Sequence, residues 1–323
     1  MAGVMTRPLV HRRARQGKPT TLHPAPGHGS CRAGKHRERR VQGPLLMLAA
    51  LGLFALLDAN SKLLSGAYPV AQVVLIRHVT MLALLLAARL LRPGLGGALG
   101  TAHPMLHLLR AAAMLGSALG FFLALREIPL AEGYLVYFTA PFMTLGLAAL
   151  LLGEPVPRAV WGWSLLGFAG VLVAMAPGLR AGGSAGAYAF ALLGTVSYAV
   201  VLTINRRLRA EAGVARLILW SALPGGLVLL PFAASGWVPP PSADWMALAA
   251  NGLLAGTSTI CLALAFRFAT AARLAPLEFS ALLWAVMLDV AIWGVWPAAE
   301  TLGGAAIVVL ACAMSQRAQG REG

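Results

Sequence analysis

Charged residues are scarce in this sequence. They make up 11% of the 323 residues, whereas hydrophobic residues make up 59%, and an ordinary soluble domain carries roughly a quarter charged residues. The uncharged apolar stretches run for about 20 residues, which at about 1.5 Å per helical residue matches a hydrocarbon core about 30 Å thick. This composition excludes a soluble globular fold and predicts an all-α membrane protein.

Cysteine and the motifs of catalysis are also scarce. The three cysteines, Cys31, Cys261 and Cys312, lie far apart in the chain, so neither a disulfide framework nor a metal site is indicated. The sequence has no HExxH pair of histidines and no Gly-x4-Gly-Lys-Ser/Thr phosphate loop. We therefore expect no catalytic residue, no metal and no cofactor.

The basic charge is concentrated at the N-terminus. Residues 1–42 hold ten of the 26 Lys and Arg residues, and Glu38 is their only acid. This tail has no aromatic residue to stack on bases, so a nucleic-acid partner is not expected. We predict a disordered, dispensable cytoplasmic tail that is not a cleaved signal peptide, with the lipid bilayer as the main partner.

Apolar windows bounded by charge, Gly or Pro predict ten membrane spans. They cover about residues 44–64, 70–92, 105–125, 130–152, 159–177, 186–206, 214–234, 245–267, 274–296 and 299–316. The Gly-rich residues 179–185 read as a linker between residues 43–178 and residues 186–316, each with five spans, and residues 317–323 form the C-terminus.

An internal repeat supports this division. A shift of 141 residues lays Phe122–Arg126 on Ala263–Arg267 and brings Gly162 onto Gly303. Because five is an odd number of spans, the second copy must insert upside down relative to the first. The predicted fold is therefore ten transmembrane helices in two inverted five-helix repeats, a common plan for secondary transporters.

The positions of Lys and Arg predict the orientation. The N-terminal tail, the C-terminus and one set of alternate connections hold 22 of these residues, whereas the other set holds only Lys62, Arg126 and Arg180. Basic segments are retained in the cytoplasm. We predict a multi-pass protein of the inner membrane with both termini cytoplasmic.

The sequence resembles the EamA family of the drug/metabolite transporter superfamily over about residues 44–316. The segments that carry the resemblance are LLDANSK (56–62), VLIR (74–77), IPLAE (128–132), APF (140–142), LGE (152–154), GFAGV (167–171) and LAPLEF (274–279). The resemblance implies a ten-helix fold with a central cavity, driven by an ion gradient or by exchange. The second half departs from the family at Val295, which stands where a counterpart of Glu154 is expected.

Charges inside the first two spans are candidate substrate or coupling residues, because a charge in hydrocarbon is costly unless it faces partners or water. Asp58 and Arg77 are each expected about 10 Å deep, and Lys62 follows Asp58 by one helical turn. These three residues are predicted to form a cluster, with Asn60 in the same segment. Its role is either substrate binding and gating or a structural ion pair.

Two acids lie in the ninth span. Glu278 and Asp289 are eleven residues apart, close to three helical turns, and so share one face. We predict that Asp289, the deeper of the two, carries a proton or binds a cationic substrate. The alternative is that Asp289 accepts hydrogen bonds from donors on a neighbouring helix.

Pro141 and several aromatic residues predict a cavity wall. Pro141 lies halfway along the fourth span, where it should kink the helix, and Tyr134, Tyr137, Phe138 and Phe142 surround it. Four residues elsewhere are candidates to complete a surface for a flat ring: Tyr198, Trp220, Phe279 and Trp284. Packing is the alternative explanation for most of these aromatic residues.

Together these features favour a secondary transporter for a small metabolite. We expect alternating access, coupled to protons or driven by exchange, in a monomer or homodimer. Two alternatives use the same fold: a membrane protein without transport activity, and an intramembrane enzyme in which Asp58 and Asp289 form a catalytic pair.

Overall fold

The computed structural model describes residues 29–152, 158–180, 185–208, 211, 213–268 and 274–320. The first 28 residues of the predicted tail, Glu154, most of the predicted linker and the last three residues lie outside this part of the chain. Arg39–Gly323 form one compact unit, and Met1–Glu38 form another. The site and its chemistry belong to the larger unit.

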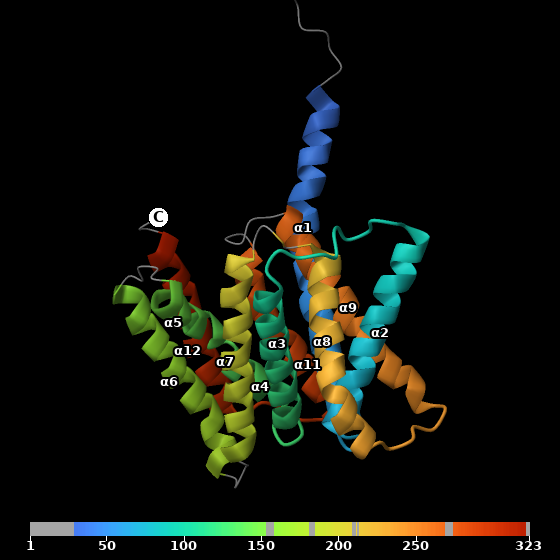
Figure 1. Cartoon of the computed structure of the whole chain (residues 1–323). Coiled ribbons are helices and arrows are strands. Elements are labelled where there is room, and N and C mark those ends of the chain that lie inside the picture. The colour runs from blue at the N-terminus through green and yellow to red at the C-terminus, as the bar shows by residue number, and fades with distance from the viewer. Residues whose placement is uncertain are drawn as a thin grey trace, which may run out of the picture. The chain divides into compact units, whose positions relative to one another are not determined.

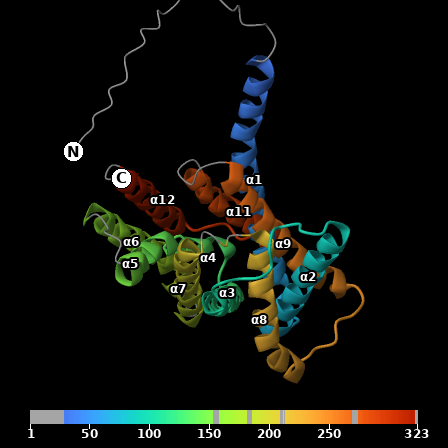
Figure 2. The ribbon, with the colours of Figure 1, turned by 45° about the horizontal axis from the view of Figure 1, so that its top comes forward.

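The described residues fold into helices and contain no strand. In chain order (Figures 1 and 2) these are α1 Gly29–Leu64, α2 Val70–Leu91, α3 Pro104–Leu125, α4 Leu130–Tyr137, α5 Ala140–Leu152, α6 Arg158–Arg180, α7 Ala185–Arg207, α8 Val214–Ser235, α9 Asp244–Phe268, η2 Ala275–Phe279, α11 Ser280–Leu288, η3 Asp289–Trp293 and α12 Ala299–Gly320. The all-α prediction is thereby confirmed.

Within the described residues, seven helical stretches are long and apolar enough to cross a membrane. They are Gln42–Leu64 of α1, Ala185–Asn205 of α7, Asp244–Phe266 of α9, and the whole of α2, α3, α6 and α8. A shorter apolar stretch, Ala299–Ser315, lies in α12. Helical residues also occupy the predicted fourth and ninth spans, but there the helix is interrupted, so the count of ten membrane crossings remains a prediction.

The interruption in the fourth span lies just before Pro141. The amide of Thr139 bonds the carbonyl of Val136, three residues back, and Pro141 has no N–H with which to continue the regular ladder. As a result α4 ends at Tyr137 and α5 begins at Ala140. The prediction that Pro141 disturbs this helix agrees with the structure.

The ninth span is interrupted twice. It opens as the 3-10 helix η2, becomes α-helical over α11, and widens into the π-helix η3. It then ends at Gly294, which has the left-handed conformation, φ 66°, that glycine adopts without steric cost. The fourth and ninth spans are therefore both discontinuous helices.

Close helix packing joins residues that are far apart in the chain. Helix α6 lies along α12, α3 along α7, and α2 against both α8 and α9 (Figures 1 and 2). At the α3–α7 contact a Cβ on Gly120 would lie 2.7 Å from the carbonyl oxygen of Phe190. Small residues let backbones approach in this way in membrane proteins, where apolar lipid supplies little hydrophobic driving force between helices.

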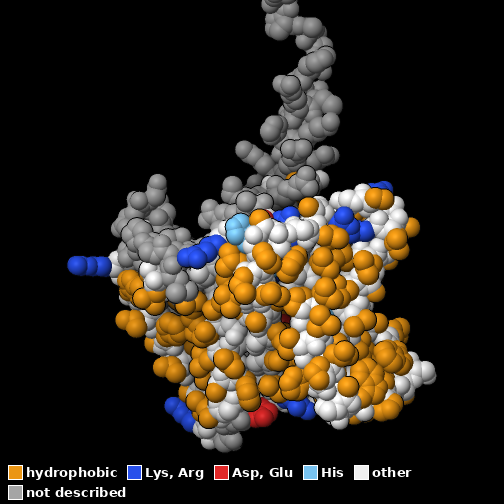
Figure 3. Space-filling view, in the orientation of Figure 1, with side chains coloured by type: hydrophobic (Ala, Val, Ile, Leu, Met, Phe, Trp, Pro, Cys, Tyr) orange, Lys and Arg blue, Asp and Glu red, His pale blue; other side chains and the backbone are white. Residues whose placement is uncertain are grey.

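The surface has an apolar belt with charges at its two ends. Figure 3 shows hydrophobic side chains over the middle of the visible face and Lys, Arg, His and acidic side chains near the upper and lower rims. Leu90, Leu91 and Leu150 are more than 80% exposed. An apolar surface of this extent is stable in lipid and not in water. The protein is thus a multi-pass membrane protein.

Candidate functional site

Asp58 of α1 and Tyr134 of α4 meet inside the helical unit. The hydroxyl of Tyr134 donates a hydrogen bond of 2.7 Å to Oδ2 of Asp58. Tyr134 is buried, and the neighbouring Leu130 and Leu135 of the same short helix are buried as well. Asp58 and Tyr134, two candidates that belong to different predicted spans, are therefore directly bonded.

Arg77 of α2 completes what we call the Asp58 cluster: Asp58, Arg77 and Tyr134. Arg77 interacts electrostatically with Asp58, yet the described structure contains no ion pair within 4.0 Å between them, and the buried Nε of Arg77 has no hydrogen-bond partner. The predicted direct pairing across α1 and α2 is therefore wrong in its geometry. Arg77 retains donor capacity for another group.

A second polar contact adjoins this cluster on α1. Nδ2 of Asn251, on α9, donates to Oγ of Ser61 at 2.9 Å, while its buried Oδ1 has no partner. Ser61 follows Asp58 by three residues and so lies on the same side of α1. The candidate residue Asn60 has a structural contact instead, since its Nδ2 bonds the carbonyl of Ala247 at 2.9 Å.

Aromatic rings extend from Tyr134 toward the second half of the chain. The ring of Tyr137 stacks on Tyr198 of α7 with centroids 4.7 Å apart, and Phe121 contacts both Tyr134 and Tyr137. Phe138 meets Phe279 edge-on at 5.9 Å. We call these six residues the aromatic wall: Phe121, Tyr134, Tyr137, Phe138, Tyr198 and Phe279.

Of the remaining candidates, Trp284 and Glu278 lie next to residues of the aromatic wall, whereas Trp220 does not. Trp284 packs in the same hydrophobic cluster as Tyr134, beside Gly52 of α1. Glu278 interacts electrostatically with Tyr198. Trp220 lies apart, because its Nε1 donates to the carbonyl of Leu99 at 3.0 Å and its ring lies 5.7 Å from His107. Its assignment to the ring-binding surface is therefore wrong.

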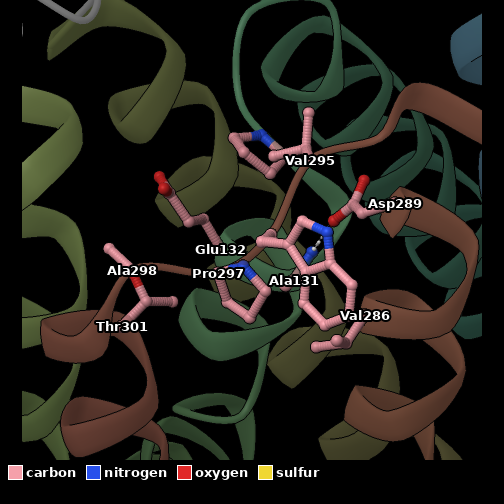
Figure 4. A pocket seen from close by; sticks show the side chains of 10 residues that line it. Ala131, Glu132, Val286, Asp289, Val295, Pro297, Ala298 and Thr301 are labelled. Atoms are coloured by element: carbon pink, nitrogen blue, oxygen red, sulfur yellow. Dashed lines mark hydrogen bonds between the residues drawn. The ribbon is translucent and has the colours of Figure 1, made fainter.

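Asp289 holds the start of α4. Its two carboxylate oxygens accept hydrogen bonds from the amides of Leu130, at 3.0 Å, and Ala131, at 2.8 Å, and Figure 4 shows the second of these bonds. First-turn amides of a helix lack partners within that helix. Asp289 is 2% exposed and lies in the π-helical turn at the end of α11. The alternative interpretation, bonding to donors of a neighbouring helix, is the one that the structure shows.

Lys62 belongs with Asp289 rather than with Asp58. Its Nζ donates to the carbonyl of Ile128 at 2.8 Å and lies 4.7 Å from the ring centroid of Trp293. It interacts electrostatically with Asp289 and Glu132. The predicted cluster of Asp58, Lys62 and Arg77 is therefore wrong, and Lys62 supports the junction of α1, α4 and η3.

A small cavity opens beside this junction. Its volume is about 110 Å³, and its lining includes Glu132 and Asp289 together with Thr301 and the segment Val295–Ala298 (Figure 4). Glu132 also accepts a hydrogen bond from the hydroxyl of Tyr188. Glu132 is not among the site residues predicted from the sequence, although its position two residues after Pro129-Leu130 is typical of the first turn of a helix.

A third polar group, which we call the loop cluster, joins two connections: Thr101, His103, His107, Glu211 and Arg216. The carboxylate of Glu211 accepts a hydrogen bond from Thr101, pairs with His103 at 2.8 Å and His107 at 3.2 Å, and lies 3.6 Å from Arg216. The hydrogen bond from Thr101, followed by that from His103, lowers the pKa of Glu211 to about 2. Sequence reasoning missed this residue.

Metal binding finds no support in the described part of the chain, which contains no group of three His, Cys, Asp or Glu residues suited to a metal ion. What it does contain is an apolar belt, discontinuous helices and buried charges next to aromatic rings. These features define a polytopic helical membrane protein with a polar interior site.

Comparison with known proteins specifies the class further. Residues 185–316 match the model of the EamA-like transporter family, so the second half of this chain is an EamA-like domain and the resemblance to that family is confirmed. A solved crystal structure with 21% sequence identity aligns with a TM-score of 0.62 over 88% of this chain and 98% of its own. That likeness shows the shared fold.

Curated relatives of the chain are transporters. An S-adenosylmethionine uptake transporter of Rickettsia conorii is 26% identical over 65% of this chain and 71% of its own length. The pseudopaline exporter CntI of Pseudomonas aeruginosa (strain UCBPP-PA14) is 28% identical over 86% and 97%. A riboflavin transporter of Rhizobium johnstonii is 29% identical over 84% and 90%.

Proposed function

We propose that this protein is a secondary transporter that moves a small metabolite across the cytoplasmic membrane by alternating access. The site is the Asp58 cluster with the aromatic wall. The observation that carries the proposal is a carboxylate and a guanidinium, Asp58 and Arg77, placed within two helical stretches that are long and apolar enough to cross a membrane, and not paired with each other. Intramembrane charges of this kind mark substrate and ion pathways.

The arrangement of the helices supports the same proposal. The two discontinuous segments, α4–α5 and η2–α11–η3, are the fourth spans of the two predicted halves, and α4 contacts α11. Helices α2 and α8, and likewise α6 and α12, occupy equivalent places in the two halves and pack against each other. In transporters built from inverted repeats, broken helices in equivalent positions form the substrate site.

The relatives support transport without choosing a substrate. Their names specify S-adenosylmethionine, pseudopaline and riboflavin, and they include an uptake system and an exporter. We propose coupling to protons or to exchange, with Asp58 as the coupling carboxylate, and both termini in the cytoplasm. A catalytic pair of Asp58 and Asp289 has no support, because Asp58 bonds Tyr134 and Asp289 bonds the amides of α4.

Comparative metabolomics tests the proposal. Cells lacking the protein, cells overproducing it and cells overproducing the Asp58→Asn variant are compared for metabolites inside the cells and in the medium. We expect at least one metabolite to shift between cell and medium with the wild-type protein and to shift much less with Asp58→Asn. The control is Glu300→Gln, which removes an exposed acid at the start of α12. An unchanged metabolite profile in all strains contradicts the transporter assignment.

A further inference from the structure

We propose that the transported molecule is a zwitterion, whose anionic group binds Arg77 and whose cationic group binds Glu278. This inference rests on the proposed transport function and specifies the substrate class of the same site. It follows from two charged side chains of the helices that have unfilled bonding capacity among the described residues.

Arg77 is a donor without an acceptor inside a membrane-spanning helix. Its buried Nε–H has no partner among the described residues, and the neighbouring Asp58 already accepts the hydroxyl of Tyr134. An unsatisfied buried donor costs about 1–3 kcal/mol, and more when it is charged. A carboxylate or phosphate matches the fork of N–H groups that a guanidinium presents. Arg77 therefore selects an anionic group.

The anion without a counter-charge is Glu278. Its electrostatic interactions with Tyr198 and Cys312 involve groups that are neutral at physiological pH, and no described hydrogen bond or ion pair reaches its carboxylate. Two residues further on, the buried hydroxyl of Ser280 also has no partner. A protonated amine would satisfy the carboxylate of Glu278, since it carries a positive charge and three donors. Glu278 therefore selects a cationic group.

The aromatic wall joins these two positions. Tyr134 bonds Asp58 at one end, Tyr137 stacks on Tyr198 in the middle, and Glu278 interacts with Tyr198 at the other end. A molecule bound along this wall meets the free donor of Arg77 at one end and the carboxylate of Glu278 at the other. A purely cationic molecule would leave the Nε–H of Arg77 without an acceptor, and a purely anionic molecule would leave Glu278 without a counter-charge.

The test uses the cellular metabolite pool and four variants. Metabolomics is performed on cells lacking the protein and on cells overproducing wild type, Arg77→Gln, Glu278→Gln, Arg180→Gln or Glu300→Gln. Arg180 and Glu300 are exposed residues of the same two charge types, so these variants are the matched controls. We expect the metabolites moved by wild type to carry both an acidic and a basic group, and each site variant to reduce the movement at least ten-fold while the controls do not.

Competition then separates the two ends of the molecule. With wild type and with Arg77→Lys, the carboxyl ester of a transported metabolite should compete less well than the free acid. With Arg77→Gln, the ester and the free acid should compete equally. This readout does not change if Arg77 only stabilises the fold. Moved metabolites that are neutral or singly charged, or an ester disadvantage that persists in Arg77→Gln, overturn the zwitterion while transport stands. Absence of any moved metabolite overturns both proposals.

Discussion

The Asp58 cluster and the loop cluster both join distant helices through charged side chains, but they differ in how many partners the carboxylate has. Among the described residues, each cluster also holds at least one buried nitrogen without a partner, and in the loop cluster these are Nδ1 of His107 and Nε of Arg216. In the loop cluster the carboxylate of Glu211 meets Thr101, two histidines, Arg216 and the amide of Ala102. In the Asp58 cluster one hydrogen bond connects Asp58 to Tyr134, and Nε of Arg77 has no partner.

This difference distinguishes a polar cluster that stabilises the fold from one that binds a ligand. A carboxylate with several partners, such as that of Glu211, stabilises one conformation, since each partner released when the cluster opens must find a new one. A carboxylate with one partner beside an unpaired guanidinium in an apolar interior gives up stability, and proteins retain such groups where a ligand completes the bonding. The comparison predicts that mutations in the Asp58 cluster change transport more than stability, and that mutations in the loop cluster do the reverse.

The largest effect is expected from removing both charges of the Asp58 cluster. The double variant Asp58→Asn with Arg77→Met keeps side chains of similar size and removes two buried charges, so its melting temperature should equal or exceed that of wild type. Transport should fall about 10- to 100-fold, the loss of about 1–3 kcal/mol of polar interaction. Melting in detergent and flux in proteoliposomes measure the two quantities. A melting temperature far below that of wild type would show that the cluster is structural.

Tyr134→Phe tests the one hydrogen bond within the cluster. The ring keeps its contact with Phe121, whereas the bond to Asp58 is lost. Transport should fall about five-fold, because a hydrogen bond contributes about 1 kcal/mol net. Tyr68→Phe is the control, since its hydroxyl also bonds an acid, Asp244, but lies outside the Asp58 cluster and the aromatic wall. Equal losses of flux in the two variants would remove the special role of the Asp58–Tyr134 bond.

The positions of most helices followed from the sequence because hydrophobic length is a local property. The predicted second span, residues 70–92, corresponds to α2 at Val70–Leu91, and the predicted third span to α3. The disturbance at Pro141 was also predictable, since a missing N–H acts on its own helix. Tyr134 and Tyr137 of the fourth span do lie together with Tyr198, whereas Phe142 contacts Phe168 of α6.

The partners of the charged residues did not follow from the sequence, because they depend on packing between distant segments. The helical spacing of Asp58 and Lys62 favoured a local cluster, but the long side chain of Lys62 reaches the carbonyl of Ile128 instead. The face shared by Glu278 and Asp289 was derived from a regular α-helix. The real segment passes through 3-10, α and π geometry, so that argument fails and Asp289 points at the start of α4.

Asp289 is intermediate between the two clusters, because it is buried and both of its carboxylate oxygens accept hydrogen bonds. Asp289→Ala leaves the amides of Leu130 and Ala131 without acceptors and should destabilise the protein by about 1–2 kcal/mol, as for loss of a helix cap. Asp289→Asn keeps one acceptor oxygen and should lose less. Both variants should keep the gradient dependence of transport. If Asp289→Asn abolishes that dependence at unchanged stability, Asp289 is a coupling residue and the cap is secondary.

The smallest effect on transport is expected in the loop cluster, where Glu211→Gln should alter stability. The folded-state pKa of Glu211, about 2, lies below its ordinary value of 4.5. The ionised carboxylate therefore stabilises the fold above pH 4.5, and this contribution is lost as the pH falls through about 2. The melting-temperature gap between wild type and Glu211→Gln should be widest at neutral pH and should shrink below pH 4.5, whereas Glu300→Gln should show no such trend. A gap that stays constant from neutral to acidic pH would mean that the neutral loop cluster is as stable as the charged one, and the contrast with the Asp58 cluster would then rest on transport alone.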